Sequence, residues 1–370
     1  MNKALLPAGF HDLLYPDAKT QHNIVVTICK CFEEHGYRKV EPPVIEFEES
    51  LFSEAGEALS NKTFRLMDPS SHKMMGVRAD MTTQVARIAT TRLINEPKPI
   101  RLSYSGDVFR VKGEGLYAER QFMQAGVELI GAQSPQSDAQ VVLVTAEALK
   151  EASIDGLCID FTIPGMIEIV LDDIKITGKD REDLITAISK KDSTQIKNLC
   201  GKKADIILQL IDPGIDIKKL CSLKLPKEAL KLCKRLGEVF QIVKANRPDI
   251  AMSIDPIGSA GFAYHKTLGF SIFSKNTHGE IGRGGRYITS DNVDGVGATL
   301  YVNELFRMSS RAPKRDTVFV ACDTNLQTIR KLRENGQIVI ISAQEVKDLK
   351  SEAKQQKCTH VFIDGDIFEV

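Results

Sequence analysis

The order of strand-like and helix-like segments most constrains the fold of this chain. A long helical stretch, about residues 165–250, is rich in Leu, Ile and Lys at helical spacing. Segments with apolar or alternating strand patterns lie on both sides of it: 74–80, 100–110, 122–131, 157–163, 268–274, 281–287 and 296–302. Strands on both sides of a helical stretch indicate one sheet with a helical insertion. We therefore expect an α+β architecture, an antiparallel sheet flanked by helices.

Other segments fill in this plan. We expect helices over 16–35, where Pro16 suits a first turn and Gly36 a C-terminal cap, and over 82–95 and 139–151. The segment YRKVEPPVIEF predicts a strand that is stopped by its two prolines.

The sequence after residue 311 changes style and predicts a second unit. Strand patterns in TVFVAC, QIVIIS and THVFIDG alternate with two helical patterns, which is typical of a small α/β unit with a parallel sheet. We expect a main domain over 1–311, including the helical insertion, and the small C-terminal α/β unit over 314–370. At roughly 55 residues, the second unit is of marginal size for independent folding.

Composition excludes several classes of protein. Lys+Arg and Asp+Glu both number 49, so the chain lacks the overall basic excess expected of a protein that binds nucleic acid. Eight cysteines occur without a CxxC pair, which indicates core thiols in a reduced cytoplasm rather than a zinc site. The chain has neither a signal peptide pattern nor an apolar run of about 18 residues. We expect a cytoplasmic protein without metal, cofactor or membrane segment.

The stretch RQFMQAGVELIG places Arg120, Gln124 and Glu128 at intervals of four, residue types that can hold a small polar ligand. Together with other ordered segments it resembles histidyl-tRNA synthetases, which have the class II aminoacyl-tRNA synthetase fold. The segments that carry the resemblance are LPAGFHDLLYPDA, GYRKVEPPVIE, VRADMTTQVAR, DVFRVKGEGLYAERQFMQAGVELIG, SIDPIGSAGFAYH, GRGGRYI and GVGATLYVNEL. It covers 1–311 well and 314–370 more weakly, as a shortened anticodon-binding domain. In that family GYRKVEPPVIE corresponds to the motif that builds the dimer interface.

The resemblance implies that the nucleotide half of a synthetase site has been lost. The family uses three arginines to stabilise charge on the phosphates of ATP. Only Arg110 is present here, because Ala260 and Glu304 stand at the other two positions, and Tyr301 replaces a glycine that leaves room for the nucleotide. Further departures from the family are Lys112, Tyr117, Ala118 and Ile288.

The amino-acid half is better preserved. The resemblance implies a histidine or amino-acid pocket made of Asp80, Thr82, Arg110, Gln124, Glu128 and Tyr264, with His265 replacing a second tyrosine. A carboxylate with neutral acceptors suits an ammonium group and an imidazole.

Structural roles are alternatives for the same residues. Arg110 could be a sheet arginine with a surface partner, and Gln124 and Glu128 could lie on the polar face of a half-buried strand. Asp80 and Thr82 could cap the helix that begins near Thr83.

A lost nucleotide half beside a kept amino-acid half resembles the regulatory-subunit family of ATP phosphoribosyltransferase. That family has no catalytic residues of its own. The resemblance implies a short-form catalytic subunit as partner in the first step of histidine biosynthesis, histidine as a possible effector, a homodimer within a hetero-oligomer, and no tRNA. The alternatives are a divergent histidyl-tRNA synthetase or amino-acid adenylating enzyme, and a histidine sensor with another partner.

Overall fold

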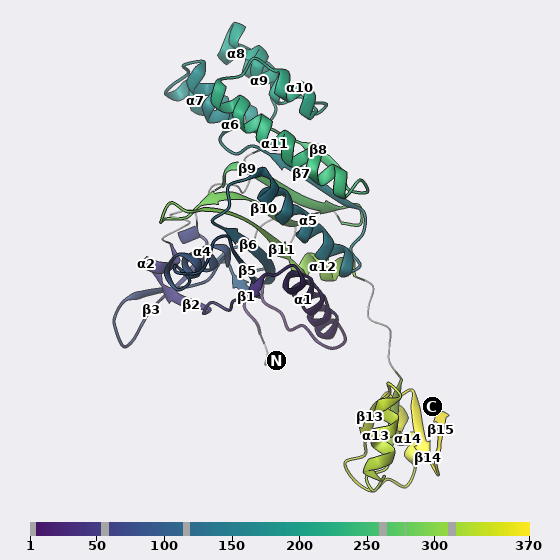
Figure 1. The fold of residues 1–370 in the computed structure, drawn as a ribbon. Coiled ribbons are helices and arrows are strands. Elements are labelled where there is room, and N and C mark those ends of the chain that lie inside the picture. The colour runs from purple at the N-terminus through teal and green to yellow at the C-terminus, as the bar shows by residue number, and fades with distance from the viewer. Residues whose placement is uncertain (1–4, 53–58, 114–118, 259–264, 278, 310–315) are drawn as a thin grey trace. The chain divides into compact units, whose positions relative to one another are not determined.

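The computed structural model describes residues 5–52, 59–113, 119–258, 265–277, 279–309 and 316–370, which form two compact units, Met1–Ser310 and Arg311–Val370 (Figure 1). Four residues discussed above, Tyr117, Ala118, Ala260 and Tyr264, lie outside the described part, as does the side chain of His265.

The first unit is built on an eight-stranded sheet, which confirms the expected α+β class. The strands pair antiparallel except at the two edges, where β1 runs parallel to β5 and β8 runs parallel to β7. Their spatial order is β1 (Arg38–Lys39), β5 (Ile100–Phe109), β6 (Gln121–Ile130), β11 (Asp294–Tyr301), β10 (Glu280–Ile288), β9 (His265–Ser274), β7 (Leu157–Thr162) and β8 (Ala251–Ile254).

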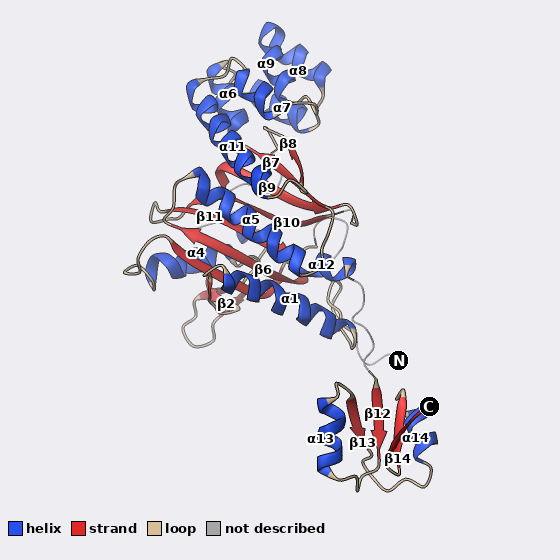
Figure 2. Cartoon of the chain, turned by 45° about the vertical axis from the view of Figure 1, so that its right-hand side comes forward, coloured by secondary structure: helices blue, strands red, loops and turns tan. Residues whose placement is uncertain are grey.

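Helices cover the two faces of this sheet unequally. The helices α1 (Asp17–Glu34) and α5 (Pro135–Glu151) cross one face, as Figure 2 shows, and α12 (Val302–Met308) follows β11. The odd-numbered residues of β6, such as Val127 and Leu129, are buried in the core that contains α1 and α5. Helix α4 (Thr82–Thr91) packs on the other face, against residues that include Leu102 and Tyr104. The even-numbered residues of β5 and β6 therefore face α4.

The segment that contains Pro42 and Pro43 does not form one strand. Residues 38–39 belong to the large sheet, whereas β2 (Ile45–Phe47) lies in a separate three-stranded sheet with β4 (Met74–Val77) and β3 (Phe64–Met67). A proline has no N–H to donate to a sheet ladder, so the two prolines separate two strands instead of ending one. The short helix α2 (Glu48–Leu51) follows β2.

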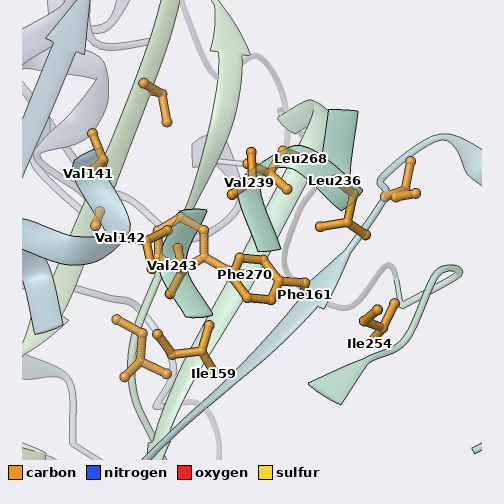
Figure 3. Close-up of a cluster of buried hydrophobic side chains, with 14 of the residues drawn as sticks. Val141, Val142, Ile159, Phe161, Leu236, Val239, Val243, Ile254, Leu268 and Phe270 are labelled. Atoms are coloured by element: carbon orange, nitrogen blue, oxygen red, sulfur yellow. The ribbon is translucent and has the colours of Figure 1, made fainter. Parts of the chain in front are cut away.

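The helical insertion lies between β7 and β8. Its helices are α6 (Met166–Asp173), α7 (Lys179–Ser189), α8 (Ser193–Cys200), the 3-10 helix η1 (Gly201–Lys203), α9 (Ala204–Leu210), α10 (Ile217–Ser222) and α11 (Lys227–Asn246). Figure 3 shows how α11 joins the main core, since its Leu236, Val239 and Val243 lie near Phe161 of β7 and Phe270 of β9.

The second unit has a four-stranded sheet in the order β13 (Ile338–Ile341), β12 (Thr317–Val320), β14 (His360–Ile363) and β15 (Asp366–Glu369), with helices α13 (Leu326–Glu334) and α14 (Leu349–Gln355). The expectation of a parallel sheet is correct for the first three strands and wrong for β15, which pairs antiparallel with β14. The turn at Asp364 and Gly365 is too short for a crossover connection, and it requires an antiparallel hairpin.

Candidate functional site

The structure brings four of the predicted pocket residues together on the face of the large sheet that α4 covers. Gln124 and Glu128 project from β6, and both are completely buried. Asp80 precedes α4, and Thr82 is its first residue. We call these four residues the Asp80–Glu128 network.

Asp80 joins the start of α4 to β6. Its Oδ1 accepts a hydrogen bond from the backbone N–H of Thr82 at 2.9 Å, and its Oδ2 accepts one from Nε2 of Gln124 at 3.1 Å. The Oε1 of Gln124 accepts in turn from the backbone N–H of Met81 at 3.3 Å. The Asp80 carboxylate thus links the first residue of α4 to Gln124 of β6. The N-cap position of α4 is Met81, so neither Asp80 nor Thr82 occupies the cap expected as an alternative.

Glu128 lies at the centre of a group of hydroxyls. Tyr287 of β10 donates to its Oε2 at 2.8 Å, and Tyr104 of β5 lies 3.5 Å from its Oε1. The Tyr104 hydroxyl also lies 2.7 Å from Oγ1 of Thr299 and 3.2 Å from Oγ1 of Thr82. Burial raises the pKa of Glu128 to about 8, although the hydroxyls oppose the shift. Glu128 is therefore mostly protonated at neutral pH.

Two glycines make room for these side chains. A Cβ atom on Gly297, which pairs with Glu128 across β6 and β11, would lie 1.8 Å from Oε2 of Glu128. A Cβ atom on Gly126 would lie 2.4 Å from the Tyr104 hydroxyl. The pocket floor therefore requires glycine at both positions.

The remaining cavity beside Glu128 is very small. It measures about 10 Å³ and is lined by Thr82, Glu128, Arg283, Gly284, Gly285, Tyr287, Gly297, Ala298 and Thr299. That volume holds about one water molecule. An amino acid is much larger than this cavity, so the described residues that line it would have to move apart before an amino acid could bind.

Arg110, a further predicted pocket residue, packs on Phe122, and its guanidinium carbon lies 4.7 Å from the centroid of that ring. Tyr301 meets the same ring edge-on, with centroids 6.4 Å apart and planes at 80°. The cation–π contact and the T-shaped contact fill this region with the chain's own side chains. That Tyr301 crowds the space of a nucleotide stays a prediction.

Glu304 carries a negative charge in the first turn of α12. It forms an ion pair with Arg307 one turn later on α12, and Arg307 also pairs with Glu119. Two carboxylates thus neutralise the one guanidinium.

Arg120 does not join the pocket, although its spacing groups it with Gln124 and Glu128. Its guanidinium lies 4.7 Å from the ring centroid of Phe64 and 5.3 Å from that of Phe10. Its backbone N–H donates to the carbonyl of Gly9 at 2.9 Å. Arg120 therefore holds the N-terminal segment against the small sheet.

Sequence reasoning missed four residues of the site: Tyr104, Arg283, Tyr287 and Thr299. The only signal for Tyr104 is its place in the alternating strand IRLSYSGDVF, on the face that carries apolar Leu102 and Val108. Tyr287 is part of GRGGRYI, one of the segments that carry the resemblance, but it was not among the predicted pocket residues.

Comparison with known proteins supplies the family context. Residues 9–305 match the family model described as histidyl-tRNA synthetase. The chain is similar to the ATP phosphoribosyltransferase regulatory subunit of Paramagnetospirillum magneticum, at 40% identity over 100% of this chain and 98% of that protein. It is also 40% identical to the regulatory subunit of the same name from Rhodospirillum centenum, over 99% of this chain and 96% of the other.

Solved structures agree on the fold. A crystal structure from Bacillus halodurans, described as an ATP phosphoribosyltransferase regulatory subunit/histidyl-tRNA synthetase, matches with a TM-score of 0.82 at 20% identity, covering 96% of this chain and 97% of that one. Histidyl-tRNA synthetase from Nostoc sp. matches with a TM-score of 0.78 at 20% identity, covering 100% of this chain and 97% of that one. Among the described residues, none of the helices has the length and apolar character to cross a membrane.

Proposed function

The chain belongs to the family of ATP phosphoribosyltransferase regulatory subunits, and from this premise we propose that it activates a short-form catalytic subunit and makes that subunit responsive to histidine. Its role in histidine biosynthesis is regulatory and non-catalytic. The partner supplies the chemistry, and this chain acts through a coupling free energy between the subunits.

The state of the nucleotide half is the observation that carries the proposal. The Phe122 ring contacts both the Arg110 guanidinium and the Tyr301 ring, and Glu304 places a carboxylate where the resemblance implies an arginine. Transfer of an adenylyl group needs fixed cations at the phosphates, and loss of one such group typically costs ~100-fold to ~1000-fold in rate. The side chains of this region support the proposal that the chain no longer activates an amino acid.

We propose the amino-acid half as the place where this chain meets its effector. Asp80 and Gln124 would hold the α-ammonium group of the amino acid. Once the pocket opens, Glu128 would accept a hydrogen bond from the imidazole. The predicted set also includes Thr82, Arg110 and Tyr264. Entry of a cationic ligand would favour the ionised form of Glu128, because an opposite charge nearby lowers a carboxyl pKa.

We further propose a homodimer within a larger hetero-oligomer. One face of the three-stranded sheet supports it, because side chains directly opposite in the register are all apolar there: Ile45, Val77 and Phe64 in one row, and Phe47, Met75 and Leu66 in the next. Ile45 and Phe47 are 42% and 39% exposed, which leaves apolar surface for a second copy to cover.

The decisive assay mixes the purified chain with a short-form catalytic subunit and follows phosphoribosyl transfer across a histidine titration. We expect activity that depends on the chain and falls with histidine. The variants Glu128→Gln and Gln124→Ala should shift the histidine response without removing activation. A catalytic subunit that is equally active and equally inhibited alone would refute the proposal. Robust histidine-dependent ATP–pyrophosphate exchange by the chain alone would instead support a synthetase.

A further inference from the structure

A second cavity is lined by residues of α1, α12, β5 and β6. It has a volume of about 270 Å³ and is lined by His11, Leu13, Gln21, Asp107, Glu119, Gln121, Phe122, Asn303, Phe306 and Arg307. Asp107 pairs with Met123 in the register of β5 and β6, and Gln121 lies two residues before Met123, so both project toward α1 and α12. We call this cavity the α1–α12 cleft.

Most polar groups of the cleft already have partners. Asn303 accepts a hydrogen bond from the backbone N–H of Met123 at 3.0 Å and donates to Glu119 at 2.9 Å. The guanidinium of Arg307 binds both Glu119 and Glu304. The positive charge of Arg307 is therefore neutralised, and the cleft has no guanidinium available for an anion among its described residues.

Two acceptors in the cleft remain available. Within the described chain, neither the Asp107 carboxylate nor the Gln121 amide forms a side-chain hydrogen bond or ion pair. Arg78 interacts electrostatically with Asp107, but its guanidinium donates hydrogen bonds to the backbone carbonyls of Asp107 and Pro42, at 2.6 and 2.8 Å. A carboxylate and an amide oxygen facing one cavity suit a group with several N–H donors and a positive charge.

The surroundings of the cleft favour a side chain of a protein over a free small molecule. Leu14 and Tyr15 follow the lining residue Leu13 and are 72% and 74% exposed. Apolar residues beside a polar cavity are typical of a contact in which a basic anchor inserts and apolar neighbours exclude water around it. Arginine is enriched among such anchors.

We propose that the α1–α12 cleft receives an arginine or lysine side chain of the catalytic subunit, with Asp107 and Gln121 as its acceptors and Leu14 and Tyr15 as its apolar rim. This inference rests on the proposed function, since it assigns the docking site of the partner that the function requires. Its two acceptors, Asp107 and Gln121, project from the face of the sheet opposite to that of Gln124 and Glu128.

Opposite charges at one position test the proposal. Gln121→Lys places a cation in the cleft, and we expect the dissociation constant of the complex with the catalytic subunit to rise at least tenfold. Gln121→Glu adds a second carboxylate beside Asp107 and should leave binding equal or tighter. Gln209→Lys makes the same change on exposed α9 and should bind like the parent chain.

A second variant tests the docking site at an exposed position, where a substitution should not disturb folding. Tyr15→Ala alters only an exposed rim residue, and it should weaken the complex while the thermal midpoint of the chain stays unchanged. Parent-like binding by both Gln121→Lys and Tyr15→Ala would overturn the docking site and leave the proposed function intact. If the parent chain itself failed to bind and activate the catalytic subunit, the proposed function and the docking site would fall together.

Discussion

Replacing Glu128 with glutamine measures how much the proton bound to this buried carboxyl contributes to the free energy of unfolding. The folded chain raises the pKa of this carboxyl from 4.5 to about 8, chiefly because the side chain is completely removed from water. Glutamine has the shape of the protonated acid and can still accept from Tyr287, but it does not titrate. The two proteins therefore differ mainly in one ionisation.

The sign of the effect follows from where the proton is held. Between pH 4.5 and 8 the folded chain keeps a proton on Glu128 that the unfolded chain releases, so the free energy of unfolding falls as pH rises. The stabilisation is fully present below pH 4.5 and is lost as pH rises through 8. Each pH unit in this window contributes up to ~1.4 kcal/mol. The difference between the parent chain and Glu128→Gln therefore reaches roughly 5 kcal/mol as an upper limit.

Urea unfolding at several pH values from 5 to 9, followed by circular dichroism, tests this reasoning. The chain has no tryptophan, so far-UV dichroism is the natural probe. Burial also raises the pKa of Asp138 and of Asp160, but both residues are present in both proteins and cancel in the difference. We expect the parent chain to lose stability relative to Glu128→Gln as pH rises. Parallel pH profiles for the two proteins would refute a protonated Glu128 in the native pocket.

Other substitutions give equally direct outcomes. Gly297→Ala should destabilise the chain by about 3 kcal/mol in thermal or urea unfolding, because its Cβ overlaps a buried carboxylate. Gly237→Ala, in the middle of α11 with only ordinary contacts near its Cβ, should instead stabilise it by about 0.5–1 kcal/mol. Asp138→Asn should cost about 3–5 kcal/mol, since the fully buried carboxylate accepts from both Arg235 and Arg286, and Arg286 would keep only its longer ion pair with Asp294. Tyr301→Gly should not restore ATP–pyrophosphate exchange, because the Glu304 carboxylate would still repel the phosphates of ATP. Measurable exchange by this variant would contradict that account.

The parts of the fold that could be predicted are those that local pattern determines. The helical insertion and the long strands of the sheet follow from periodicity, and α5 follows from its cap, where Ser134 accepts from the backbone N–H of Ser137 and Pro135 occupies the first turn. The separation of β1 from β2 could not be predicted. Two strands on either side of Pro42 and Pro43 enter different sheets, and only tertiary packing decides which partners they find.

The site shows the same division. The resemblance placed Asp80 and Gln124 in one pocket, and their side chains form a hydrogen bond that was not itself predicted. The Tyr104 and Tyr287 hydroxyls around Glu128 were not expected, because their places depend on strand register. Tyr104 meets a residue 195 positions away, and a shift of one residue in either strand would turn that hydroxyl to the other face.

These contacts bear on why the amino-acid half has been kept. Glu128 is mostly neutral at neutral pH, accepts a hydrogen bond from Tyr287 and fills the space that Gly297 leaves open. Such a residue would be retained for packing alone, even in a chain that had stopped binding histidine. Stability and histidine response must therefore be measured on the same variant. If Glu128→Gln changes the pH dependence of unfolding and leaves the histidine response of the complex untouched, the pocket is a structural remnant and the effector acts elsewhere in the assembly. If both change, the protonated carboxyl is also the group that the effector ionises when it enters.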